Sequence, residues 1–157
     1  MLMKTYNIIT KALGLLIALT MQTALFAQEN NANNAIGKKQ VIYNDSHEVA
    51  CIIEENGVVY DGYTRRIGTF DADGTIRDGY NQVRGKLGSS NTIFDQNGRI
   101  VGRIMDSGTI INGLNRMVGT INSKGKVQDA SKRTMGYAKD VDQRIVAIYF
   151  FSDFLHR

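Results

Sequence analysis

Apolar and polar positions alternate along this chain in short runs that recur every 17 residues between Gly57 and Lys139. Each copy holds two alternating runs of about five residues, separated by stretches rich in glycine, asparagine and aspartate. Alternation with a period of two predicts β-strands, and a 17-residue unit with two strands leaves no room for a helix. The pattern therefore predicts an all-β domain of repeated β-hairpins.

Glycine marks two columns of this repeat, which continues without insertion or deletion. The first column is Gly68, Gly85, Gly102, Gly119 and Gly136. The second column, six residues further on, is Gly57, Gly74, Asn91, Gly108 and Gly125. We interpret the second column as the left-handed residue of a three-residue hairpin turn, of which Ala72-Asp73-Gly74 is the example.

This turn fixes which residues of neighbouring strands lie opposite one another. It places Phe70 opposite Ile76 and Gly68 opposite Asp78, whereas a two-residue turn would place Phe70 opposite the charged Arg77. The same register predicts the apolar pairs Ile53–Val59, Leu87–Ile93, Ile104–Ile110 and Ile121–Val127. It also predicts the pairs Gly85–Asp95, Gly102–Asn112 and Gly119–Asp129.

The first glycine column needs a physical reason, because glycine in a strand costs about 0.5–1 kcal/mol relative to alanine. We expect close backbone approach at an axis where the strands converge, so that a side chain would collide with its symmetry mates. Replacing Gly102 by valine is then expected to overpack the axis. Cys51 stands at this position in an additional N-terminal copy, and we expect it to be buried.

The two ends of the repeat region are expected to complete a ring. Gln40–Asn44 repeats the pattern of Gly57–Asp61 but has no preceding hairpin partner. The C-terminal run from Ile145 to Leu155 is strongly apolar, and we expect a strand beginning at Ile145 to complete the ring with Val41–Tyr43. The same run leaves a second interpretation open, in which it forms a dimer surface.

These residues resemble the five-fold β-flower family, small secreted proteins found mainly in Bacteroidetes. The resemblance rests on the two glycine columns and extends from about Gln40 to the C-terminus. It implies five 17-residue β-hairpin repeats arranged as petals around a pseudo-five-fold axis. It brings no established activity and no functional residues. The repeat pattern by itself also fits an open β-solenoid or a fragment of YD-type repeats.

The N-terminal segment is predicted to be a secretory signal peptide, residues 1–27. Lys4 and Lys11 precede an apolar run that ends in Ala24-Leu25-Phe26-Ala27, which predicts cleavage after Ala27. The uncharged run covers residues 12–27 and is shorter than the roughly 20 residues of a membrane-spanning helix, which disfavours the alternative of an anchor. We therefore expect an exported protein, periplasmic or extracellular, with no membrane span after cleavage.

The mature chain is expected to consist of a flexible polar spacer, residues 28–39, and one repeat domain, residues 40–157. Loss of the two signal-peptide lysines lowers the formal net charge from +4 to +2. The remaining basic residues are spread among acidic ones, and the export signal removes the usual partners. Nucleic-acid binding is therefore excluded from the expected functions.

Few residues support catalysis or metal binding. The chain has two histidines, His47 and His156, and one cysteine, so no zinc ligand set can be assembled. We interpret Asp45-Ser46-His47 as a polar turn, because three consecutive residues cannot form a catalytic triad. The segment Asp71–Ile76 resembles the middle of a calcium loop but lacks its first and twelfth ligands. We predict neither a metal nor a cofactor.

An arginine stands three residues before four of the first-column glycines. These are Arg65, Arg99, Arg116 and Arg133. In a closed ring they would gather on one face and bind an anionic glycan, phosphate or carboxylate. The alternative is that each forms a local ion pair or hydrogen bond with an acid or amide four residues earlier.

The sequence leaves three classes of function, which we give in descending order of preference. The first is a non-catalytic binding module of the cell envelope, with an anionic glycan or an envelope protein as partner. The second is a structural or assembly protein of the envelope. The third is a glycan-active hydrolase, which would depend on carboxylates such as Asp71 and Asp73.

Overall fold

The structure is a computed structural model that describes residues 37–155. All of the described residues belong to one compact unit. The predicted signal peptide, most of the predicted spacer and His156 lie outside the described residues.

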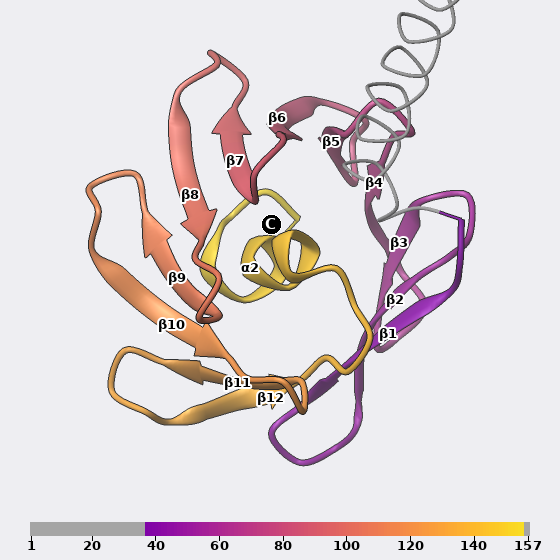
Figure 1. The fold of residues 1–157 in the computed structure, drawn as a ribbon. Helices are drawn as coiled ribbons and strands as arrows, with labels where there is room; N and C mark the ends of the chain where they lie inside the picture. The colour runs from indigo at the N-terminus through magenta and orange to yellow at the C-terminus, as the bar shows by residue number, and fades with distance from the viewer. Residues whose placement is uncertain (1–36, 156–157) are drawn as a thin grey trace, which may run out of the picture. The chain divides into compact units, whose positions relative to one another are not determined.

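Twelve strands and one helix make up the described part of the chain, and the strands form a single closed sheet (Figure 1). The strands are β1 (Gln40–Asn44), β2 (Val49–Ile53), β3 (Val58–Asp61), β4 (Arg66–Phe70), β5 (Thr75–Asp78), β6 (Val83–Leu87), β7 (Thr92–Asp95), β8 (Ile100–Ile104), β9 (Thr109–Asn112), β10 (Met117–Ile121), β11 (Lys126–Asp129) and β12 (Thr134–Tyr137). Each strand is antiparallel to both of its neighbours in this sheet. The all-β, hairpin-repeat prediction is therefore confirmed.

The strand register predicted from the apolar columns is also confirmed. Phe70 lies opposite Ile76, and Gly68 lies opposite Asp78. The corresponding predicted pairs recur between β2 and β3, β6 and β7, β8 and β9, and β10 and β11. Gly74 has a φ of +86° and its N–H donates to the carbonyl of Asp71, as expected of the three-residue turn. In this register the apolar column forms the core of the ring.

The number of hairpins in the described ring exceeds the number of column glycines by one. Five hairpins carry a column glycine, on β4, β6, β8, β10 and β12. The sixth is the N-terminal hairpin β1–β2, which carries Cys51 at the equivalent position. Cys51 is fully buried, as expected.

Of the two segments predicted to close the ring, only the N-terminal one does so. β1 does pair with β12, with Tyr43 opposite Tyr137 and Asn44 opposite Gly136. The prediction of a strand beginning at Ile145 is wrong, because that segment forms helix α2 (Gln143–Phe151). Because β1 and β12 form hydrogen bonds with each other, no unpaired edge remains in the sheet for a further strand.

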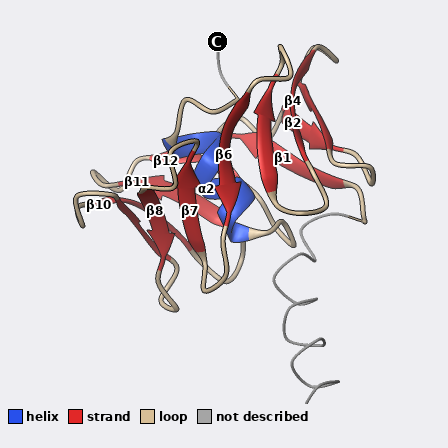
Figure 2. Ribbon diagram, turned by 90° about the horizontal axis from the view of Figure 1, so that it is seen from above, coloured by secondary structure: helices blue, strands red, loops and turns tan. Residues whose placement is uncertain are grey.

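Helix α2 lies inside the ring of hairpins, as Figures 1 and 2 both show. Its first turn is capped by Asp142, whose side chain accepts a hydrogen bond from the N–H of Arg144. Ile145, Val146, Ala147 and Ile148 are all buried, and a helix apolar on every side is expected where protein surrounds it. The C-terminal run is thus core, which removes its interpretation as a dimer surface.

Four of the five column glycines face this central segment rather than one another. A Cβ added at Gly119 would lie within 2.7 Å of the Phe151 ring and 2.5 Å from the carbonyl oxygen of Gln128. Side chains of the C-terminal segment stand in the same way over three more column glycines: Gly68, Gly85 and Gly136. The expectation of collisions between symmetry mates is therefore wrong: the collisions are with α2, the residues after it and the neighbouring strand.

Candidate functional site

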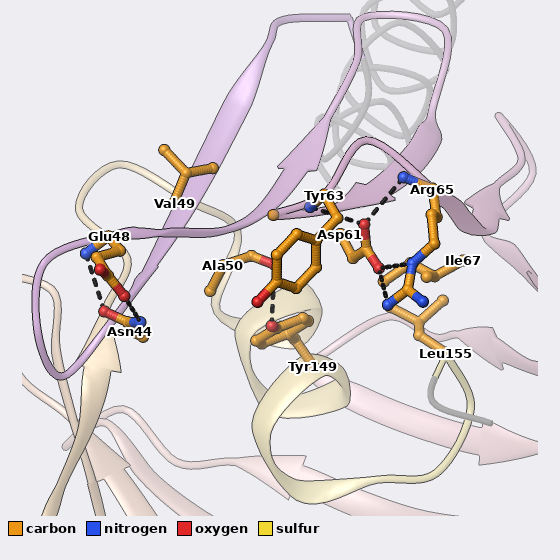
Figure 3. A pocket seen from close by; sticks show the side chains of 11 residues that line it. Asn44, Glu48, Val49, Ala50, Asp61, Tyr63, Arg65, Ile67, Tyr149 and Leu155 are labelled. Atoms are coloured by element: carbon orange, nitrogen blue, oxygen red, sulfur yellow. Dashed lines mark hydrogen bonds and ion pairs between the residues drawn. The ribbon is translucent and has the colours of Figure 1, made fainter.

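An open pocket of about 770 Å³ lies between the first two hairpins (Figure 3). Because neighbouring strands run antiparallel, the loops that follow odd-numbered strands all lie at one rim of the ring, which we call the arginine rim. The pocket opens between two of these loops, β1–β2 and β3–β4. Its lining is Asn44, Glu48, Val49, Ala50, Asp61, Gly62, Tyr63, Arg65, Ile67, Tyr149 and Leu155.

Asp61 organises one wall of the pocket. Its Oδ1 accepts hydrogen bonds from the backbone N–H groups of Tyr63 and Arg65, which hold the β3–β4 loop in place. Its Oδ2 accepts from the Arg65 guanidinium at 2.7 Å. Partial burial raises the pKa of Asp61, but the hydrogen bonds from Arg65 and Tyr63 outweigh it and lower the pKa below 3.8. Asp61 is therefore a fixed, ionised group that positions its neighbours.

The opposite wall carries the same turn with a different side-chain pair. Asn44 Oδ1 accepts from the backbone N–H groups of Ser46 and Glu48, so the loop geometry repeats that of Asp61. Here the amide nitrogen of Asn44 donates to Glu48 Oε2 at 2.9 Å. A carboxylate thus stands where the next hairpin has an arginine, so this wall carries a negative charge while the Asp61–Arg65 wall carries a neutral ion pair.

Two tyrosines give the pocket aromatic surface. Tyr63, at the tip of the β3–β4 loop, is 82% exposed, and the Arg65 guanidinium lies 5.5 Å from its ring centroid. Tyr149 of α2 forms part of the floor, and its hydroxyl donates to the carbonyl of Ala50 at 3.1 Å. Burial raises the pKa of Tyr149 to about 12, so its phenol keeps its proton.

Cys51 lies close to this floor but is not part of the pocket lining. Burial, with a further contribution from Asp61, raises the pKa of its thiol to about 12. The thiolate is the nucleophilic form of cysteine, so Cys51 is held in its unreactive form.

The four predicted arginines all lie on the arginine rim, each in a different loop. Arg65 and Arg133 pair with Asp61 and Asp129, which is the ion-pair alternative. At Asp95 and Asn112 the side-chain oxygen accepts from the backbone N–H of Arg99 or Arg116. Only Arg65 lines the pocket, and anion binding by the four arginines stays a prediction.

The carboxylates that a hydrolase would need are engaged in the loops of the ring. Asp71 accepts from Arg77 Nε at 2.7 Å. Asp73 accepts from the N–H and hydroxyl of Thr75, whose hydrogen bonds lower the pKa of Asp73. A general acid for glycoside hydrolysis needs a raised pKa instead, so Asp73 is suited to holding its turn.

His47 lies in the β1–β2 loop, as the polar-turn interpretation expects, and stacks on Tyr137 with ring centroids 4.1 Å apart. Among the described residues, no group of three or more histidine, cysteine, aspartate or glutamate side chains is arranged to hold a metal ion. Within the same residues, no helix has the length and apolar character needed to cross a membrane.

Sequence reasoning missed three residues that matter here: Tyr63, Tyr149 and Arg144. The sequence gives a weak indication of Tyr63, because large side chains recur at its repeat position as Tyr80 and Leu114, which are similarly exposed. Tyr149 had no such indication, because the sequence predicts a strand beginning at Ile145, and Arg144, directly before that strand, had none either. Arg144 is buried, pairs with Asp142 at 2.7 Å and donates to the carbonyl of Gly88 at 3.0 Å.

The fold and the pocket define a class of protein: a closed ring of β-hairpins around a C-terminal helix, with a polar and aromatic pocket at one rim. A comparison with known protein families matches residues 23–154 to the family described as 5-fold beta-flower protein. The chain belongs to this family, and the resemblance found in the sequence is confirmed. The family description names a fold and no activity. No curated protein matches the sequence.

Proposed function

We propose that the protein is an exported, non-catalytic binding module of the cell envelope, and that the pocket between the first two hairpins binds a glycan. The observation that carries the proposal is the composition of this pocket. An exposed aromatic ring lies beside an amide, two carboxylates and a guanidinium, on two loops whose backbone N–H groups donate to the side chains of Asp61 and Asn44. A few positioned polar groups beside apolar surface are typical of small-molecule sites.

The charges of the lining favour a neutral glycan over the anionic one that the arginines alone predicted. Arg65 is already neutralised by Asp61, and Glu48 adds a second carboxylate without a basic partner in the lining. A sugar ring offers one apolar face to Tyr63 and hydroxyl groups that both donate to Glu48 and accept from Arg65. An anionic ligand would have to approach the excess carboxylate.

A glycan array followed by titration of the best ligand tests this function. Tyr63→Ala is expected to weaken binding at least about tenfold, which corresponds to about 1.4 kcal/mol. Leu114→Ala is the matched control, because Leu114 occupies the same turn position three copies away and is 74% exposed. Absence of glycan binding, or equal binding by the two variants, would contradict the proposal.

Export is part of the same proposal and rests on the N-terminal charge and hydropathy pattern. Protein recovered from a host with a compatible secretion system should begin at Gln28. Recovery of a chain that retains Met1 from the membrane fraction would exclude this cleavage.

A structural or assembly role in the envelope is the second candidate. It is favoured by exposed apolar side chains that recur at one repeat position, directly after the loops of the arginine rim: Val49, Val83, Ile100 and Met117. Sedimentation of the purified protein distinguishes the two roles, since assembly requires association that grows with concentration and a binding module does not.

A further inference from the structure

The C-terminal segment passes the hairpins in order, and its side chains cover the column glycines one after another. Phe150 stands over Gly136 and Phe151 over Gly119. Further along the segment, Phe154 stands over Gly85 and Leu155 over Gly68. Ser152 and Asp153 come between these two pairs in the chain, so small or polar residues fall where the hairpin of Gly102 lies.

Gly102 is consequently unlike the other column glycines. A Cβ added there would make only ordinary contacts, 3.5 Å from Ile93 Cδ1 and 3.6 Å from the carbonyl oxygen of Ile111. At the other four positions an added Cβ would lie under 3.0 Å from a side chain of the C-terminal segment. The expected overpacking by a larger residue at Gly102 is therefore wrong for this position, because the hairpin faces a cavity here.

The cavity has a volume of about 600 Å³, within the range of about 300–1,000 Å³ typical of small-molecule sites. Its walls are mainly apolar and come from strands β7–β10, from α2 and from the residues after α2, with Ile93, Ile110, Ala147 and the rings of Phe151 and Phe154 among them. Asn112, Ser152 and Asp153 add polar groups to the lining. This combination suits a largely apolar ligand that carries a polar substituent.

We propose that this cavity is a second binding site, distinct from the pocket at the first two hairpins, and that it takes a small molecule with an aromatic ring. The ring would occupy over Gly102 the place that phenylalanine rings occupy over Gly85, Gly119 and Gly136. A glycine allows a flat group to approach the strand backbone closely, and the phenylalanines around the cavity provide ring-to-ring contacts. In this proposal the ligand's aromatic ring lies over one column glycine, and phenylalanine rings of the protein lie over three others.

Titration with p-cresol, a phenol that combines an aromatic ring with one hydroxyl group, tests the site. In amide NMR spectra of the purified protein we expect saturable shifts with a dissociation constant in the millimolar range or below. The shifts should concentrate at Gly102, Ala147 and Ser152. Shifts that do not saturate, or that centre on Ala50 and Tyr63, would overturn the proposal.

Two variants of β8 sharpen the test. Gly102→Leu fills the cavity with the protein's own side chain and should weaken p-cresol binding at least about tenfold. Arg103→Leu introduces the same side chain one residue further on, where the side chain is exposed, and should bind like the wild type. Equal binding by both variants would refute the site. If Gly102→Leu does not fold, Gly102→Ala with Ala147→Leu replaces it, judged by the same criterion.

Discussion

At the scale of single residues, the column glycines show how much a neighbouring element determines the role of a residue. The same amino acid recurs at one repeat position, yet Gly119 lies under the Phe151 ring and Gly102 faces a cavity. The repeat explains why both are glycines, and only the path of the C-terminal segment explains why they differ. Stability measurements can separate these two situations.

Alanine substitutions at Gly102 and Gly119 should therefore have opposite effects. Gly119→Ala places a methyl group against the Phe151 ring and the carbonyl of Gln128, and should destabilise by about 1–3 kcal/mol. Gly102→Ala meets no such contact and should stabilise by about 0.4–1 kcal/mol, through lower unfolded-state entropy. Urea midpoints measure both. Equal destabilisation by the two changes would show that α2 does not cover the column as described.

A second residue-scale prediction concerns the acid side of the pH profile. The backbone N–H of Arg133 lowers the pKa of Asp129 below 3.8. Burial opposes this effect, and the guanidinium of Arg133 adds to the lowering. A lowered folded-state pKa contributes stability above the unfolded value, and that stability is lost as the pH falls through the folded pKa. Asp129 therefore stabilises the fold near neutral pH and loses this effect below about pH 3.8.

The variant Asp129→Asn tests this dependence, because Asn112 shows that asparagine supports the same turn. Near neutral pH the variant should be less stable than the wild type, and the gap should close in strong acid. Urea midpoints at both pH values provide the comparison. A gap that stays constant across the acid range would show that Asp129 does not act through its charge.

At the scale of elements, the hairpins were predictable from the sequence and the helix was not. The register followed from columns such as Phe70 and Ile76, because one face of each strand must be apolar throughout. Ile145–Phe151 consists mainly of β-branched and aromatic residues, whose local preference is for strands. It forms a helix because β1 and β12 complete the sheet, and the segment inside the ring must satisfy its own backbone hydrogen bonds.

The candidate pocket was less predictable for the same reason. Arg65 was found from its repeat position, and its pairing with Asp61 was among the alternatives. The floor of the pocket includes Tyr149, whose position depends on α2 and not on the repeat. The negative charge of the pocket comes from a deviation from the repeat, Glu48 in place of arginine. The repeat pattern predicts what its copies share, and it does not predict the role of a residue that differs.

Helix α2 is anchored at its start by a buried ion pair that should be important for stability. Arg144 joins the Asp142 carboxylate to the carbonyl of Gly88, so its removal leaves a poorly solvated carboxylate without its partner. Arg144→Ala should destabilise by about 3–5 kcal/mol. Arg133→Ala, which breaks an exposed pair, is the control and should cost only about 0–1 kcal/mol. Similar urea midpoints for both variants would contradict this anchoring role.

At the scale of the whole molecule, closure of the ring determines where helix α2 lies and therefore where the two candidate sites form. The first strand of the domain pairs with the last, which surrounds α2 and leaves no strand edge open. The cavity at Gly102 and the floor of the pocket both depend on α2 being held there. A stack of hairpins that stayed open would lack both sites.

A disulfide across the closing strands tests this closure most directly. Tyr43 and Tyr137 lie opposite each other on β1 and β12, and antiparallel partners have Cα separations of about 4.5–5.5 Å, which a disulfide can bridge. The double variant Tyr43→Cys with Tyr137→Cys should oxidise to a monomeric crosslinked protein, and its stability should rise by about 2–4 kcal/mol. The control pair, Tyr43→Cys with Gln128→Cys, involves strands that are not neighbours and should remain reduced or crosslink between molecules. Failure of the first pair to crosslink within one folded chain would contradict the closed ring.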